Sequence, residues 1–440
     1  MKLKVHNINK VQDADIKLEG LTVIAGSNGS GKSTIGKLLF SMIKSMNYAQ
    51  NNINQSKEKK VKKRIDELYS RISGCFNRYN NKELESIFPF PSSILMERLM
   101  ALEDEDSIEQ YLRKMQEWIE SQEIAPRMQS LFAKDIDNIR IALGDSEAAD
   151  IASEVRVFVE SEFMNKICSY GTQKSQIDLE FDTPSDYLHL EFENDEIEKV
   201  RVNGDSALMD ATYVESPLYL HILDTLLNAM TYREYQKKQR ILFRGMVPIH
   251  IKDLANKLYA LQMVSPNNEM TQKFELENIM GGHFIFDKES RTIKFSHKNM
   301  EMDLSPINIA SGIKTFGLIQ ILLETQVIGN SKILIWDEPE NHLHPQWQVA
   351  FAEYLVMLAQ MGIPVVVSTH SPYFVQGIRY FSAKHTMEKY TNYYLAEEQE
   401  NYLSIIKDVT CDLNQIFSKL AEPLNEIMNV DMVRRETQGK

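Results

Sequence analysis

The chain has 440 residues, of which 43% are hydrophobic, and a formal net charge of −13 at pH 7. This length predicts two or three domains with a large core, and no apolar run approaches the roughly 18 residues that a membrane span needs. The negative charge disfavours binding of nucleic acid over the whole surface, because that affinity comes from Lys and Arg neutralising phosphates. The first residues read as a strand and not as a signal peptide, so we expect a cytoplasmic protein with no membrane partner.

The loop at 26–34, GSNGSGKST, fits the pattern G-x-x-x-x-G-K-[ST]. It follows the apolar run 21–25 and leads into a helical segment at 35–40, which is the context that a phosphate-binding loop requires. We expect Lys32 to reach the β- and γ-phosphates of ATP and Ser33 to bind Mg²⁺. The predicted phosphate-binding residues are Gly26, Ser27, Asn28, Gly29, Ser30, Gly31, Lys32, Ser33 and Thr34. The alternative is a Gly/Ser-rich turn that binds nothing.

A charged segment at 51–175 carries apolar residues at helical spacing, such as Leu95, Leu99 and Leu102. It predicts a helical insertion whose heptads are too irregular for a long coiled coil. Alternating apolar residues at 176–204 predict a small antiparallel β meander, and a further hairpin is expected between His283 and Phe295.

Two clusters of basic residues allow local contact with nucleic acid, although a solvated helix face is the more common reason for such a cluster. The first comprises Lys57, Lys59, Lys60, Lys62, Lys63 and Arg64. The second comprises Arg233, Lys237, Lys238, Arg240 and Arg244.

The apolar run at 333–336 predicts a buried parallel strand that ends in Asp337 and Glu338. Open α/β sheets place ligand-binding groups at this end of their strands, so Asp337 is expected near Mg²⁺. Glu338 is the candidate to orient or deprotonate the water that attacks the γ-phosphate. Alone, the two acids would equally fit a solvated strand end.

A second apolar strand, at 363–367, ends in a polar turn that contains His370. A single histidine at a strand end is usually structural. Because this strand is expected to share its edge with Asp337 and Glu338, we place His370 in the catalytic site, within reach of the γ-phosphate or the attacking water.

With these three segments the chain resembles the ABC-type ATPases, and within them the branch of SMC, RecF and OLD proteins. The resemblance implies an α/β fold, an ABC-type P-loop ATPase head with a mixed sheet flanked by helices, formed by 1–50 and 205–405. The head would carry the helical insertion at 51–175 and a helical C-terminal tail at 406–440, with the small antiparallel β element at 176–204 belonging either to the head or to the insertion. The glutamine that senses magnesium in such proteins has no counterpart near the expected strand at 211–217.

The same resemblance identifies 308–314 as a divergent signature segment, in which Ser311 and Gly312 would bind the ATP of a second subunit. This implies a homodimer or a higher homo-oligomer formed through the ATP sites. The alternatives are that Ser311 only caps a helix, and that Lys314 is a solvated helix lysine instead of a positive charge at the interface. His342 and His344 form an H-x-H pair beside Glu340 with no third zinc ligand nearby, and the resemblance implies a turn facing the other subunit.

Only 440 − 370 = 70 residues follow His370, and they contain no D-x-D pattern, so we expect no nuclease domain. This layout resembles the PtuA family, the ATPase subunits of Septu-type anti-phage defence systems. That resemblance implies an ATP-binding and ATP-hydrolysing subunit that acts as a nucleotide-gated scaffold or sensor for a separate nuclease, such as an HNH protein. The alternative is a DNA repair or recombination ATPase of the RecF/SMC type that couples hydrolysis to DNA binding.

Overall fold

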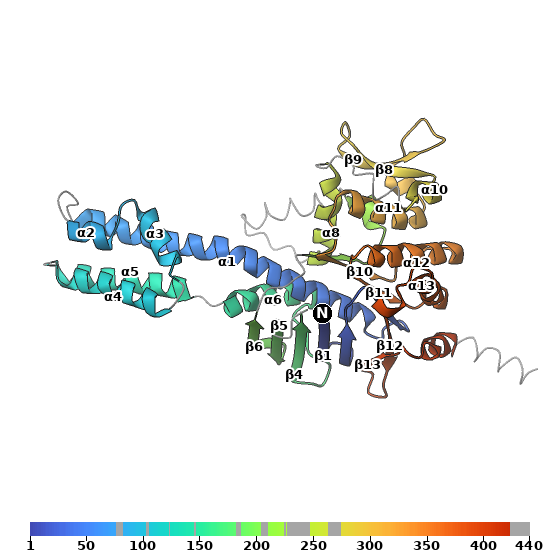
Figure 1. Cartoon of the computed structure of the whole chain (residues 1–440), viewed down its shortest axis with the longest axis horizontal. Helices are drawn as coiled ribbons and strands as arrows, with labels where there is room; N and C mark the ends of the chain where they lie inside the picture. Colours follow the sequence, from blue (N-terminus) through green and yellow to red (C-terminus); the bar gives the residue numbers. More distant parts are fainter. Residues whose placement is uncertain are drawn as a thin grey trace, which may run out of the picture. The chain divides into compact units, whose positions relative to one another are not determined.

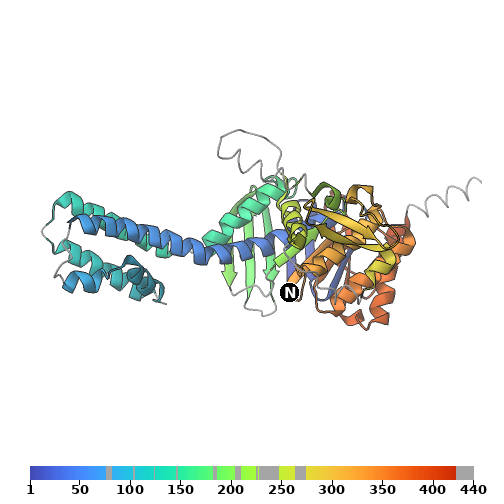
Figure 2. The same ribbon diagram turned by 90° about the horizontal axis from the view of Figure 1, so that it is seen from above.

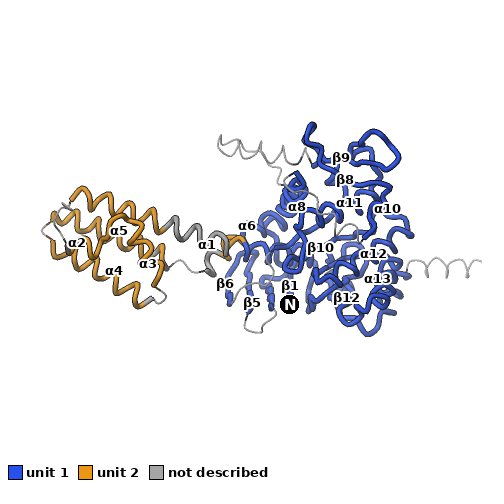
Figure 3. Tube along the Cα trace, turned by 45° about the horizontal axis from the view of Figure 1, so that its top comes forward, with its two compact units in different colours: residues 1–47, 155–440 blue, residues 48–154 orange. Residues whose placement is uncertain are grey.

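The computed structural model describes residues 1–75, 82–102, 105–122, 124–144, 147–181, 186–203, 210–223, 226, 247–262 and 274–422. The chain divides into two compact units, one formed by 1–47 with 155–440 and the other by 48–154 (Figure 3). We had expected the helical insertion at 51–175, whereas the helical unit ends at 154 and α6 (Glu147–Phe163) finishes within the first unit.

The first unit is built on a sheet of eleven strands in the order β6-β5-β4-β1-β2-β13-β12-β3-β11-β10-β7 (Figure 1). The strands from β12 to β7 run parallel to one another, while β6, β5, β4, β1 and β2 form an antiparallel series. Their bounds are β1 Lys2–Ile8, β2 Val11–Lys17, β3 Leu21–Gly26, β4 Lys174–Glu180, β5 Tyr187–Glu193, β6 Glu196–Asn203, β7 Asp210–Val214, β10 Lys332–Asp337, β11 Val365–Thr369, β12 Thr391–Glu398 and β13 Ser404–Asp408.

The parallel half of the sheet is covered on both faces, which explains why its strands are apolar throughout. Side chains alternate, so Val23, Trp336 and Val367 join the core with helices α11 (Ser311–Glu324), α12 (Pro345–Gln360) and α13 (Pro372–Lys384). On the opposite face, helix α1 (Lys32–Cys75) approaches so closely that a Cβ atom on Gly36 would lie 2.7 Å from the ring of Tyr213. The sheet therefore holds α1 and α12 on opposite sides of the strand ends.

Two predicted β elements are present, one as part of the main sheet and the other as a separate small sheet. The meander at 176–204 forms β4, β5 and β6 and extends the main sheet through pairing of β4 with β1 (Figure 2). The separate small sheet is instead the later hairpin, β8 (Gly282–Asp287) with β9 (Thr292–His297). Gln320 of α11 holds this hairpin by two hydrogen bonds of 2.9 Å. Its Oε1 accepts from the N–H of Phe284, and its Nε2 donates to the carbonyl oxygen of Phe284.

Helix α8 (Ile249–Tyr259) and the short α10 (Leu276–Met280) complete the core of this unit, with 3-10 turns at Ala260–Gln262, Pro306–Asn308 and Glu388–Tyr390. The tail that we expected to be helical from 406 begins inside β13, which pairs with β12 and β2, and a helix follows up to 422. The predicted α/β fold, with a mixed sheet flanked by helices, is confirmed.

The second unit is entirely helical among its described residues. It contains the later part of α1, then α2 (Lys82–Ile87), α3 (Ser92–Met100), α4 (Glu105–Glu120) and α5 (Pro126–Gly144). Its own core joins Leu68, Leu112 and Phe132, each fully buried. Although the heptads are irregular, α1 is a single helix of 44 residues that begins in one unit and ends in the other. In the described parts of the chain, no helix has the length and apolar character to cross a bilayer.

Candidate active site

The loop at 27–31 follows the fully buried strand β3 and leads into α1, so Lys32 lies in the first turn of that helix. Its ammonium group is buried and donates to the carbonyl oxygens of Gly26 at 3.0 Å and Ser27 at 2.8 Å. The same Nζ lies 3.5 Å from Oε1 of Glu338, a residue 306 positions later (338 − 32). The structure therefore brings the predicted phosphate-binding loop and the predicted acidic strand end into direct contact.

Glycine is required in the loop at two positions for different reasons. Gly31 has φ +87°, and a Cβ atom there would lie 2.9 Å from Val11. At Gly26 the obstacle is close approach, since a Cβ atom would lie 2.7 Å from the carbonyl oxygen of Ala396 on β12. Of the other predicted loop residues, Ser27, Asn28, Gly29 and Ser33 are exposed, Thr34 is half-buried and Ser30 is buried with no bonding partner for its Oγ.

Asp337 ends β10 and is buried, with 8% of its surface exposed. Its Oδ2 accepts a 2.9 Å hydrogen bond from the hydroxyl of Tyr213 on β7, and its Oδ1 accepts one from Ser368 on β11. Burial, and to a smaller extent the negative charge of Asp337, raises the pKa of Tyr213 well above its usual 10. The phenol therefore keeps its proton and donates it to the hydrogen bond. Two neighbouring strands therefore fix the carboxylate in one orientation.

Glu338 occupies the left-handed region, with φ +47°, a conformation that non-glycine residues adopt only when their surroundings impose it. Its N–H donates to the carbonyl of Ser368 at 3.1 Å, and its Oε2 accepts from Asn341 at 3.0 Å. Its Oε1 lies 3.3 Å from Nδ1 of His370. His370, followed by Asn341 and Lys32, lowers the pKa of Glu338 to about 2, so its carboxylate is ionised at neutral pH.

His370 lies directly after β11 and is partly exposed. Chiefly the Glu338 carboxylate, with a smaller contribution from Glu340, raises the pKa of His370 above its usual 6.5. Lys32, Glu338 and His370 thus form one connected group of alternating charge beside the loop.

The segment identified as a divergent signature lies elsewhere, at the start of α11. The N-cap of this helix is Ala310, so the alternative that Ser311 caps it is wrong. Gly312 packs against Trp347, whose ring would lie 2.7 Å from a Cβ atom at that position. Lys314 is 3% exposed, with Nζ 3.1 Å from Nδ1 of His221, so it is not a solvated lysine, and burial lowers its pKa.

One histidine of the H-x-H pair, His344, has a local structural role. His344 is the N-cap of α12 and accepts from the N–H of Gln346. Within the described ranges, no group of three or more His, Cys, Asp or Glu residues is arranged to hold a metal ion.

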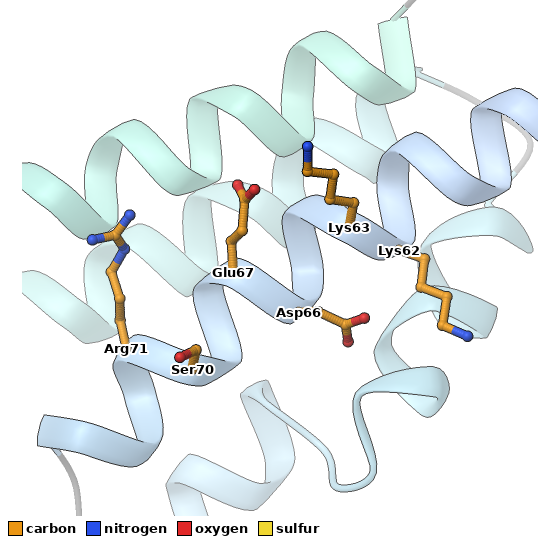
Figure 4. Close-up of a pocket in the computed structure, with 6 residues that line it drawn as sticks. All are labelled: Lys62, Lys63, Asp66, Glu67, Ser70 and Arg71. Carbon is orange, nitrogen blue, oxygen red and sulfur yellow. The ribbon is translucent and has the colours of Figure 1, made fainter. Parts of the chain in front are cut away.

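The first basic cluster is only partly described, at Lys62, Lys63 and Arg64 on α1. Acidic residues lie among these cations, as Figure 4 shows for Asp66 and Glu67 beside Lys62 and Lys63. Arg64 pairs with Glu67 at 2.9 Å and Arg71 pairs with Asp135 at 2.5 Å. This mixture of charge is typical of a solvated helix face. The second cluster, from Arg233 to Arg244, lies outside the described residues.

Four residues of the site received no role from sequence: Tyr213, Glu340, Ser368 and Thr369. Glu340 is buried and its Oε1 accepts from Thr369 Oγ1 at 2.5 Å and from the N–H of His370 at 2.9 Å. One sequence signal could have found them. The apolar strand at 365–369 ends in two consecutive hydroxyl residues, Ser368 and Thr369, and two hydroxyl groups can donate hydrogen bonds to two nearby carboxylates.

The residues present fit a nucleoside triphosphate with Mg²⁺. The loop offers exposed residues just before a helix N-terminus, the buried Ser30 Oγ has no partner, and Lys32 supplies a positive charge. Asp337 and Ser33 provide a carboxylate and a hydroxyl, which are the oxygen ligands that Mg²⁺ takes in phosphate sites.

The AAA ATPase domain family matches residues 1–375. Among solved structures, the SMC head domain from Thermotoga maritima has 12% identity and a TM-score of 0.37, covering 93% of this chain and 98% of that chain. The Smc head domain from Pyrococcus furiosus, with an extended coiled coil and bound to the C-terminal domain of ScpA, has 10% identity and a TM-score of 0.38, covering 97% and 98%. The comparison with curated proteins finds no match. Since the family match spans most of the sequence and includes Lys32, Asp337 and His370, the chain belongs to the AAA ATPase domain family and is an ATPase.

Proposed function

We propose that ATP is hydrolysed at the group formed by Lys32, Glu338 and His370. The observation that carries this proposal is the position of Glu338, whose Oε1 lies 3.5 Å from Lys32 Nζ and 3.3 Å from His370 Nδ1. Lys32 binds the β- and γ-phosphates together with the backbone of residues 26–34, and Ser33 and Asp337 hold Mg²⁺. When bound, Mg²⁺ neutralises charge on the phosphate oxygens.

Glu338 acts mainly by orienting the attacking water. A carboxylate with a pKa near 2 is a weak base, but it is a strong hydrogen-bond acceptor, and phosphoryl transfer depends mostly on positioning and charge stabilisation. Glu338 raises the pKa of His370, which favours the protonated imidazole, and both His370 and Lys32 lie beside Oε1 of Glu338. In that form the two cations stabilise the negative charge of the transferring phosphoryl group.

We further propose that turnover is gated, which favours a nucleotide-controlled scaffold over a rapidly cycling motor. Oε1 of Glu338 already has Lys32 and His370 beside it and Oε2 accepts from Asn341, so a water that is oriented by Glu338 competes with these neighbours. Slow or conditional hydrolysis follows from this competition. A second subunit, contributing Ser311 and Gly312 to the ATP, is the proposed trigger for the rearrangement.

The proposed biological role is that of the ATPase subunit of an anti-phage complex of the Septu type, in which homo-oligomers control a separate nuclease such as an HNH protein. The support is the resemblance of the three motifs together with a compact helical unit at 48–154, which contains none of the residues proposed to bind ATP and is available to hold a partner. This unit carries mixed charge where it is described, which gives no support to the repair alternative.

The test compares Lys32→Ala and Glu338→Gln with the native protein. We expect Lys32→Ala to lose Mg-ATP binding in calorimetry, and Glu338→Gln to bind ATP, hydrolyse it at least tenfold more slowly and accumulate as a dimer or larger assembly by native mass measurement. Hydrolysis by Glu338→Gln at the native rate would refute the role of Glu338. The scaffold role is tested by co-purification with a nuclease encoded beside this gene, which we expect for the native protein and not for Lys32→Ala. Stimulation of ATP hydrolysis by DNA ends would favour the repair alternative.

A further inference from the structure

Glu340 is a buried carboxylate that takes no part in the proposed chemistry. It lies in the turn after β10 with 3% of its surface exposed. Its Oε1 accepts from the Thr369 hydroxyl at 2.5 Å and from the backbone N–H of His370 at 2.9 Å, and lies 3.6 Å from Nδ1 of His370. Its Oε2 is buried with no hydrogen-bond partner.

A carboxylate in this position is costly for folding. Burial raises the pKa of Glu340, and a buried polar atom without a partner destabilises the folded state. Stability alone does not explain the residue, because Asp337 and Ser368 already tie the same turn to β11, as do the backbone atoms of Glu338 and Ser368. The additional contacts made by Glu340 are specific to the two residues Thr369 and His370.

These contacts hold His370, which lies outside the regular elements. His370 follows the last residue of β11 and precedes α13, whose N-cap is Ser371. Its imidazole is partly exposed and faces Glu338. A backbone N–H bonded to a buried acceptor limits rotation of this residue, so the imidazole keeps its place beside Glu338.

We propose that Glu340 is a positioning residue, which holds His370 through its backbone N–H and through Thr369 so that the imidazole stays against Glu338. The inference rests on the proposed function for its effect on hydrolysis, but its structural part concerns only the described contacts. It predicts that what matters is an acceptor oxygen at this point, because both donors are satisfied by Oε1.

The test uses three variants at this contact. Glu340→Ala removes the acceptor, Glu340→Gln retains an amide oxygen, and Thr369→Val removes one donor while keeping the shape. We expect Glu340→Ala to lower kcat roughly 10- to 100-fold with the KM for Mg-ATP within about twofold, since misplaced catalytic groups have costs of this order. Glu340→Gln should stay within about threefold of the native kcat, and Thr369→Val should fall between the two. Glu324→Gln, which changes a buried carboxyl at the end of α11 that makes no contact with His370 in the described hydrogen bonds, is the matched control.

A second readout separates this inference from the proposed function. In NMR spectra of protein labelled at histidine side chains, with the His370 signals assigned through His370→Gln, Glu340→Ala should shift or broaden the His370 signals and leave those of His6 and His283 unchanged. This result is expected whether or not the native protein hydrolyses ATP. Unchanged His370 signals, a kcat for Glu340→Ala within twofold of native, or a Glu340→Gln as inactive as Glu340→Ala would each overturn the proposal. If Glu340→Ala fails to fold, Glu340→Gln and Thr369→Val decide the question by the same two readouts.

Discussion

Two groups of charged residues in the same unit are built differently. Between α1, β7 and α8, Lys44 and Lys257 pair with both Asp210 and Asp253 at 2.6–2.9 Å, so two positive and two negative charges match. At the ends of β10 and β11, Glu338 shares contacts with Lys32 and His370 at 3.3–3.5 Å, and one oxygen of Glu340 has no partner. The ion pairs of the first group are short and balanced in charge, whereas the contacts of the second group are longer and partly open to solvent. The comparison indicates that one holds the fold and the other is arranged to change its contacts.

The largest expected effect is a loss of stability when the charge-balanced group of Lys44, Lys257, Asp210 and Asp253 is broken. Lys257→Met removes a buried ammonium group that bonds Asp210, Asp253, the carbonyl of Ala211 and the hydroxyl of Thr212, leaving two half-buried carboxylates with a single cation. Breaking a buried ion pair on one side costs about 3–5 kcal/mol. We expect a marked drop in melting temperature. Lys407→Met, which removes an exposed partner of Glu397, should have little effect, and equal melting of the two variants would refute the distinction.

In the group of Lys32, Glu338 and His370, the substitution His370→Gln should affect ATP hydrolysis and leave stability nearly unchanged. The side chain is partly exposed, so its loss changes melting little, but removing the positive charge beside Glu338 should lower the rate of ATP hydrolysis roughly 100-fold or more. Single-turnover hydrolysis measures this change. A variant that melts several degrees lower but hydrolyses ATP normally would place His370 with the structural residues instead.

A third effect depends on pH and involves neither group. Burial raises the pKa of Glu324 to about 7 from its usual 4.5, so the folded state binds this proton more tightly than the unfolded state. Its contribution to stability is therefore complete below pH 4.5 and is lost as the pH rises to about 7, by an amount on the order of 3 kcal/mol. We expect the melting temperature of Glu324→Gln relative to the native protein to rise between pH 5 and pH 8. A constant difference would contradict the assignment.

The sequence predicted the parts of this site whose signals are local. Residues 26–34, Asp337 and His370 each follow a short apolar strand, and strand ends in a parallel sheet meet at one edge. What it did not predict depends on pairing between distant segments. The meander joins the main sheet because Leu3 faces Leu179, and Tyr213 reaches Asp337 because β7 lies beside β10. Residues 213 and 337 are 124 positions apart, and neither periodicity nor spacing carries that register.

Tyr213, one of the four site residues without a role predicted from sequence, provides the smallest of the four effects and the sharpest test of how Asp337 is oriented. Tyr213→Phe removes only the hydroxyl that donates to Asp337 at 2.9 Å, and the ring still packs against α1. Groups that orient a metal-binding carboxylate typically affect metal affinity by roughly 10-fold or more when removed. We expect the Mg²⁺ concentration that supports half-maximal ATP binding to rise by about this factor with unchanged melting. Tyr394→Phe, which loses a buried hydroxyl bonded to the N–H of Lys17, is the matched control and should leave the Mg²⁺ dependence unaltered. If both variants respond alike, Ser368 alone is sufficient to orient Asp337, and the contact across β7 and β10 serves the fold only.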